Sequence, residues 1–120
     1  MQDVIHFYKT QDLTKVKAFY ESILGLSLYL DQGSCLIYHL NGYGKIGFCL
    51  HHPKEMNDST CITFVYSSKE EVDDMAVSFT SKGLVCTECK VNPTYHIYHF
   101  FLRDNEGRLL EFQTFLEGKR

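Results

Sequence analysis

The spacing of hydrophobic residues predicts two amphipathic helices. The first is expected at about residues 13–24, where the apolar residues of one helix face are Leu13, Val16, Tyr20, Ile23 and Leu24. The second is expected at about residues 68–82, and its apolar stripe consists of Val72, Met75, Ala76 and Phe79. Each helix is predicted to end at a glycine, Gly25 and Gly83, because glycine readily adopts the left-handed backbone that closes many helices.

The remaining apolar segments are short and are typical of strands separated by turns rich in Asn, Asp and Gly. Around the first helix they cover residues 4–9, 26–30, 35–40 and 45–51. Around the second helix they cover residues 60–66, 84–90, 95–102 and 109–115. The order of one strand, one helix and three strands therefore occurs twice, in a first module at residues 1 to about 52 and a second at about 60 to 120, with a polar connector at residues 52–59.

This repeated order predicts an α+β fold built from two βαβββ modules. One module alone cannot bury both faces of its sheet, so its helix is expected to cover one face and the sheet of the other module to help cover the second. We therefore expect two curved mixed sheets around a shared cavity, with the helices outside, in a single domain of 120 residues.

Composition and charge exclude several classes of function. Hydrophobic residues make up 44% of the chain and aromatic residues 14%, which is enough for a packed core. The net charge is −3 and no basic run is present, so no nucleic-acid partner is expected. No apolar run is long enough to cross a bilayer and the first residues lack the features of a signal peptide, so we expect no membrane partner and a cytoplasmic location.

The chain has five cysteines, and without a secretory signal we expect all of them to be reduced thiols. Cys86 and Cys89 form a single CxxC motif inside the strand predicted at residues 84–90. Residues three apart on a strand point to opposite faces, so we interpret this motif as a chance spacing and not as a metal or redox site.

Three stretches resemble the vicinal oxygen chelate superfamily, which includes glyoxalase I, bleomycin-resistance proteins and extradiol dioxygenases. Residues 11–25 match the family's DL…FY…LG first helix, and residues 64–68 fall where the family begins its second helix. Residues 100–111 match its FF-x-DPDGN-x-x-E ending, with Asn105 in place of the proline. The resemblance implies the paired-module fold and a homodimer.

The resemblance also implies a divalent metal held by side chains from the first and last strands of each module. Glu111 lies seven residues after Asp104 and matches the family's carboxylate ligand. The other three positions fall on Ile5, Phe48 and Cys61, of which only the cysteine can ligate. Glu111, Cys61 and His99 would form an irregular mixed site, so we expect a degenerate site with no native metal and no other cofactor.

Strand alternation in this register predicts which side chains face the cavity. Phe7, Phe48 and Phe101 are expected to form aromatic walls, whereas Tyr8 points to the opposite face. Glu111, His99 and Cys61 are expected to converge as its polar groups, and Gln113 completes the predicted ligand-binding set. Glu111 is also the candidate catalytic residue, because a carboxylate between apolar neighbours is costly to bury without a purpose.

Three functions remain open at this point. The first is a binding protein that captures a small apolar or aromatic molecule in the cavity. The second is a metal-dependent enzyme of the same superfamily, a lyase, isomerase, dioxygenase or thiol transferase with Glu111 in its active site. The third is an interaction protein with a closed pocket, since fold alone does not decide among these functions.

Overall fold

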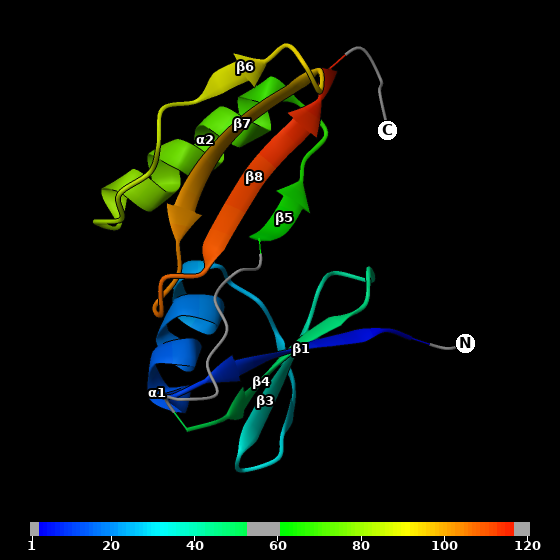
Figure 1. The fold of residues 1–120 in the computed structure, drawn as a ribbon, viewed down its shortest axis with the longest axis vertical. Coiled ribbons are helices and arrows are strands. Elements are labelled where there is room, and N and C mark those ends of the chain that lie inside the picture. The colour runs from blue at the N-terminus through cyan, green and yellow to red at the C-terminus, as the bar shows by residue number, and fades with distance from the viewer. Residues whose placement is uncertain (1–2, 53–60, 117–120) are drawn as a thin grey trace. The chain divides into compact units, whose positions relative to one another are not determined.

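The computed structural model describes residues 3–52 and 61–116 and divides the chain into two compact units, Met1–Asn57 and Asp58–Arg120. Each unit contains one strand, a helical segment and three further strands, in that order (Figure 1). The prediction of an α+β fold made of two βαβββ modules is therefore confirmed. From residue 53 on, the predicted connector lies outside the described residues.

The first unit forms a four-stranded mixed sheet in the order β1-β4-β3-β2. Its elements are β1 (Ile5–Thr10), α1 (Leu13–Val16), the π-helical segment η1 (Lys17–Ile23), β2 (Leu28–Asp31), β3 (Cys35–His39) and β4 (Lys45–Leu50). Strand β1 runs parallel to β4, and the other neighbouring strands run antiparallel.

The first helix has the predicted extent but a different geometry. The Asp12 side chain caps its start by accepting a hydrogen bond from the Lys15 backbone N–H at 3.1 Å. In η1 the helix widens, and the Leu24 N–H bonds to the Phe19 carbonyl five residues earlier. Phe19 and Tyr20 are both buried in this wider segment. Regular helical spacing had predicted only Tyr20 on the apolar face.

The second unit forms another four-stranded mixed sheet, in the order β5-β8-β7-β6. Its elements are β5 (Cys61–Val65), α2 (Lys69–Ser81), β6 (Lys90–Asn92), β7 (Ile97–Arg103) and β8 (Leu109–Phe115). Strand β5 runs parallel to β8, which pairs antiparallel with β7. Ser68 caps α2, its hydroxyl accepting a hydrogen bond from the Glu71 N–H at 3.2 Å.

The strand predicted at residues 84–90 is wrong, because β6 begins only at Lys90. Thr87 bonds to Phe101 of β7 in two ways. Its backbone N–H donates to the Phe101 carbonyl at 2.9 Å, and its hydroxyl accepts from the Phe101 N–H at 2.8 Å. The Thr87 hydroxyl thus accepts the hydrogen bond that a backbone carbonyl would accept in a regular β-ladder. Regular pairing of β6 with β7 starts only at Lys90. The Cys86–Cys89 motif precedes β6 instead of lying within a strand.

Each unit packs its helical segment against one face of its own sheet. In the first unit the Tyr20 ring contacts the Phe48 ring, with centroids 4.3 Å apart. In the second unit the ring centroid of Phe79 in α2 lies 4.9 Å from that of Phe112 in β8 and 6.2 Å from that of Phe100 in β7. These rings are almost completely buried, so the helix-facing side of each sheet is the hydrophobic core of its unit.

The turn between β7 and β8 is held by a buried ion pair. Arg108 is 2% exposed, and its Nη1 donates to Asp104 Oδ2 at 2.9 Å. Its backbone N–H donates to the other Asp104 oxygen at the same distance. The turn fixes the register of the two strands, which places Glu111 opposite Phe101.

Cys35 and Cys49 are direct cross-strand neighbours in β3 and β4, and a disulfide joins them. Their Cα atoms lie 4.1 Å apart. The prediction that all five cysteines are reduced is therefore wrong for this pair, whereas Cys61, Cys86 and Cys89 are free thiols. Cysteine counting cannot reveal this bond, because it depends on the register of two strands and not on sequence spacing.

Among residues 3–52 and 61–116, no helix is long and apolar enough to span a membrane.

Candidate functional site

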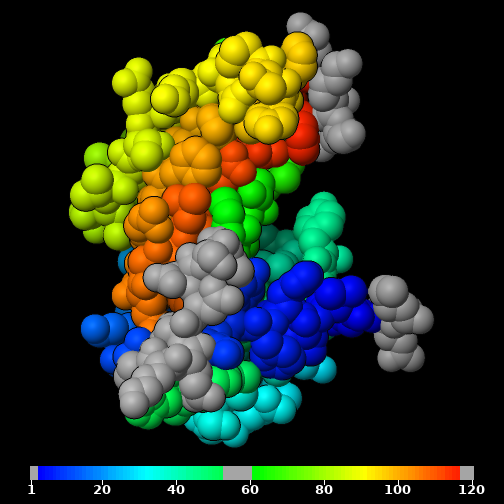
Figure 2. Space-filling model, in the orientation of Figure 1, coloured from blue at the N-terminus to red at the C-terminus, as the bar shows by residue number. Residues whose placement is uncertain are grey.

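The candidate site lies on the face of the second sheet that points away from α2. Leu110 and Phe112 of β8 are buried toward the helix, so Glu111 and Gln113 point to the opposite side. We call this side the second open face, because it belongs to the second unit and the helix of that unit does not cover it. Its residues are Cys61, Thr63, His99, Phe101, Glu111 and Gln113. Figure 2 shows β7 and β8, in orange and red, on the side that α2 of the same unit does not cover.

A hydrogen-bonded network joins three of these side chains. The His99 Nδ1 atom lies 2.6 Å from Glu111 Oε2, and the Thr63 hydroxyl donates to Glu111 Oε1 at 2.8 Å. The side chains of His99 and Glu111 are only 9% and 13% exposed. A poorly hydrated carboxylate is costly without partners, so the two bonds compensate for the burial of Glu111 and hold it in one orientation.

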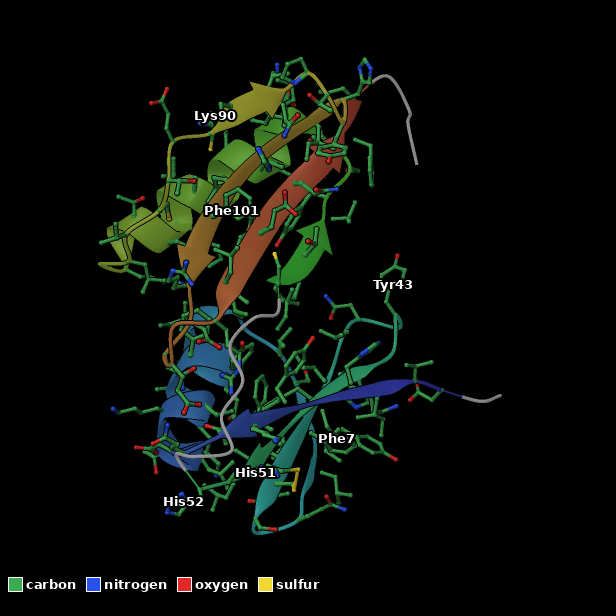
Figure 3. All side chains as sticks on the ribbon, viewed as in Figure 1. Phe7, Tyr43, His51, His52, Lys90 and Phe101 are labelled. Carbon is green, nitrogen blue, oxygen red and sulfur yellow. A yellow bond between two sulfur atoms is a disulfide. The ribbon has the colours of Figure 1, made fainter. Side chains whose placement is uncertain are left out.

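The network assigns the position of the proton on the His99 ring. A carboxylate oxygen only accepts hydrogen bonds, so Nδ1 carries the hydrogen that is donated to Glu111. In the neutral ring, Nε2 is then an acceptor, and no described residue bonds to it. The ring also meets the Phe101 ring edge-on, with centroids 4.9 Å apart, so an acceptor nitrogen and an aromatic surface are adjacent on this face (Figure 3 labels Phe101 on β7).

Gln113 and Cys61 extend the polar surface in two directions. Gln113 pairs with His99 across β8 and β7 and is 6% exposed, and among the described residues no hydrogen bond holds its side-chain amide. Cys61 is exposed, with its sulfur 4.0 Å from the Thr63 hydroxyl. Of the predicted polar groups, Glu111 and His99 are thus in direct contact, whereas Cys61 reaches them only through Thr63.

Thr63 is the site residue that sequence reasoning missed. It lies beside Glu111 in the β5–β8 register and supplies the second hydrogen bond to the carboxylate. The signal was present, because strand alternation from Cys61 puts Thr63 on the same face. The family motif does not mark this position, and the hydroxyl became significant only once its neighbour was known.

The first unit has a different composition at the equivalent positions. Gly47 of β4 pairs with Phe7 and Ile37, as Glu111 of β8 pairs with Thr63 and Phe101. A Cβ atom on Gly47 would lie 2.5 Å from Phe7 Cε1, so the aromatic ring rests directly over the glycine. The position equivalent to Glu111 is therefore Gly47 and not Phe48.

The prediction that Phe48 shares a face with Phe7 is wrong. Phe48 is fully buried against Tyr20 of η1, on the same side of the sheet as Tyr8. Phe7 is 54% exposed and, as the strand neighbour of Tyr8, points to the other side. The alignment by spacing was displaced by one residue in β4, and a shift of one residue reverses the face of a strand. The predicted orientation of Tyr8 is confirmed.

The residues present do not fit the metal that the fold family implies. With the corrected register, the four positions are Ile5, Gly47, Cys61 and Glu111, and the first two have no donor atom. Both oxygens of Glu111 are already engaged by His99 and Thr63. Among the described residues, no group of three or more His, Cys, Asp or Glu side chains is placed to hold a metal ion. The donor atoms at these positions therefore do not match the metal site of the fold family.

Comparison with known proteins identifies the architecture. No protein-family model and no curated protein matches the sequence. Among solved structures, a glyoxalase/bleomycin resistance protein/dioxygenase from Nocardioides is similar, with a TM-score of 0.83 and 16% identity over 100% of this chain and 86% of that one. Lactoylglutathione lyase from Agrobacterium tumefaciens has a TM-score of 0.78 and 19% identity, covering 97% and 96% of the two chains.

A third similar structure is that of a glyoxalase/bleomycin resistance protein/dioxygenase family enzyme from Burkholderia phytofirmans PsJN. It has a TM-score of 0.78 and 20% identity, over 93% of this chain and 97% of that one. These identities are low, and the likeness concerns the fold and not the activity. The resemblance found in the sequence is thus confirmed at the level of architecture: the chain has the fold of the glyoxalase/bleomycin resistance/dioxygenase proteins.

Proposed function

We propose that the chain binds a small, largely apolar or aromatic molecule at the second open face, without a metal. The observation that carries the proposal is the contact of His99 with both Glu111 and Phe101. It places a fixed polar group beside an aromatic ring on a sheet face that the unit's own helix does not cover. Binding sites for small organic molecules commonly combine apolar surface with a few fixed polar groups.

The alternative of a metal-dependent enzyme has less support. The lyase activity in the name of the Agrobacterium protein belongs to that protein, and Glu111 is the main residue that argues for a similar activity here. That carboxylate already accepts two hydrogen bonds, and the equivalent position of the first unit is a glycine under the Phe7 ring. The donor set favours binding over metal chemistry.

Binding of naphthol, observed in saturation-transfer NMR and quantified by calorimetry, tests the proposal. Phe101→Ala should weaken binding several-fold, because an aromatic contact contributes about 0.5–1.5 kcal/mol beyond its buried area. The matched control is Tyr95→Ala, which removes a 70% exposed aromatic ring from the turn before β7. Binding that is absent, or that the two substitutions weaken equally, would contradict the proposal.

The proposal also covers the oligomeric state of the protein and its location in the cell. The family resemblance favours a homodimer, and light scattering at micromolar concentration distinguishes it from a monomer. A cytoplasmic location stays a prediction, and the Cys35–Cys49 disulfide bears on it because persistent disulfides are rare in cytosolic proteins. The acidic charge balance supports a small-molecule partner over a nucleic acid.

A further inference from the structure

We propose that the ligand of the second open face presents a cis amide, an N–H group beside a C=O group as in a lactam ring, to His99 Nε2 and the Gln113 amide. The inference rests on the proposed function and names the chemical class that the site selects. It follows from the hydrogen-bonding capacity left over on two neighbouring side chains.

The first contact is set by Glu111. Because Nδ1 of His99 donates to the carboxylate at 2.6 Å, the neutral ring offers a lone pair at Nε2 and needs a donor from the ligand. Thr63 fixes the carboxylate through its second oxygen, so the ring orientation is held from behind. A ligand N–H group satisfies this acceptor, whereas a ligand with acceptors alone would leave it unpaired.

The second contact comes from Gln113. Its side chain is more than nine-tenths buried, and a buried amide without a partner is costly. Among the described residues, Asn105 alone has side-chain polar atoms that are both sealed from solvent and unbonded, so the Gln113 amide still reaches a surface. Its NH2 group can donate to a ligand carbonyl.

The two contacts match the geometry of a cis amide. His99 and Gln113 lie directly opposite each other on β7 and β8. The Cβ atoms of such a pair are about 4.5–5.5 Å apart, which allows one amide edge to reach both side chains. Phe101 neighbours His99 and offers its ring to the apolar part of the ligand. The negative charge of Glu111 on the same face disfavours an anionic ligand such as a carboxylate.

Calorimetric titration of wild-type protein with four bicyclic probes tests the inference: carbostyril, which has the cis amide; N-methylcarbostyril, which lacks the N–H; naphthalene, which lacks both groups; and naphthoate, which is anionic. Carbostyril should bind about tenfold or more tightly than N-methylcarbostyril, since the methyl group leaves the acceptor nitrogen of the largely buried His99 ring without a donor. Naphthoate should bind weakest.

Gln113→Leu should weaken the binding of carbostyril about tenfold and leave the binding of naphthalene unchanged. The control is Gln32→Leu, the same substitution in the exposed turn between β2 and β3. If carbostyril, its N-methyl derivative and naphthalene bind wild type equally and Phe101→Ala weakens all three, the amide inference is overturned while the proposed function stands. If none of the probes binds, both fail. The wild-type comparison decides the inference even if Gln113→Leu does not fold.

Discussion

His99 Nδ1 lies 2.6 Å from Glu111 Oε2, and the two residues come from neighbouring strands, β7 and β8. Their sequence separation is only 12 residues, but the pairing depends on the turn at Asp104 and Arg108, which sets the register. The pair is therefore part of the candidate site, and its formation also depends on the correct register of β7 and β8.

A double-mutant cycle measures the coupling of the pair. Glu111→Leu removes the acceptor and His99→Leu removes the donor, and each should lower the free energy of unfolding by about 1–3 kcal/mol because the remaining partner loses a buried hydrogen bond. The double mutant should lose less than the sum of the two, with a coupling of at least about 0.5 kcal/mol. Urea unfolding provides the measurement, and strict additivity would show that the contact contributes nothing.

The effect of Gly47→Ala on stability should depend on the residue at position 7. The substitution should destabilise the protein when Phe7 is present and stabilise it when Phe7 is replaced by alanine. In wild type the new methyl group would lie 2.5 Å from Phe7 Cε1, so the ring must leave its place and stability should fall. With Phe7→Ala as the background the contact left is Ile37 Cγ1 at 3.4 Å, an ordinary van der Waals distance, and alanine should stabilise the strand by about 0.5–1 kcal/mol relative to glycine. Unfolding midpoints of the four proteins test this. Equal effects in both backgrounds would mean that the ring does not rest on the glycine.

Tyr66 gives a prediction at alkaline pH. Burial, with a smaller effect of the Glu71 charge, raises the pKa of Tyr66 from 10.0 to about 12. A raised pKa means that the folded protein holds the proton more tightly than the unfolded chain. The resulting stabilisation is complete below pH 10 and should be lost as the pH rises from about 10 to about 12.

Unfolding at a series of pH values tests this dependence, with phenolate absorbance following the ionisation itself. Tyr66→Phe should remove part of the alkaline loss of stability and one high-pH step from the absorbance titration. An unchanged titration curve in this variant would contradict the assignment.

Thiol counting tests the cross-strand disulfide. When the protein is purified and unfolded without reductant, the reactive thiols should be those of Cys61, Cys86 and Cys89, and Cys35 and Cys49 should react only after reduction. Reduction should lower stability by about 3 kcal/mol, the value expected for a loop of about 15 residues. Five reactive thiols before reduction would restore the expectation drawn from the sequence.

Much of the fold was predictable because its signals are local. The start of α2 at Ser68 and the extent of β8 follow from a capping residue and from a short apolar run between turns. The helix ends at Gly25 and Gly83 have positive φ angles of 72° and 86°, which explains why glycine marks them.

The features that were not predictable depend on register between strands. The face of Phe48 was assigned by counting from a family pattern, and an error of one position reversed it. Strand β6 was misplaced because the Thr87 hydroxyl replaces a backbone partner, which no apolar pattern reports. Glu111 was found from the family motif and His99 from strand alternation with Phe101, but the bond between them required the structure.

The strand order of the second unit has a consequence for its synthesis. Strand β5 is an edge strand whose one neighbour in the sheet is β8, and the Thr63–Glu111 bond that joins them spans 48 residues. At about 5–20 residues per second, roughly 2–10 s separate the emergence of these two residues from a ribosome. Throughout this interval β5 has no strand to pair with, so nascent chains that end before β8 should be the form of this protein most prone to bind chaperones.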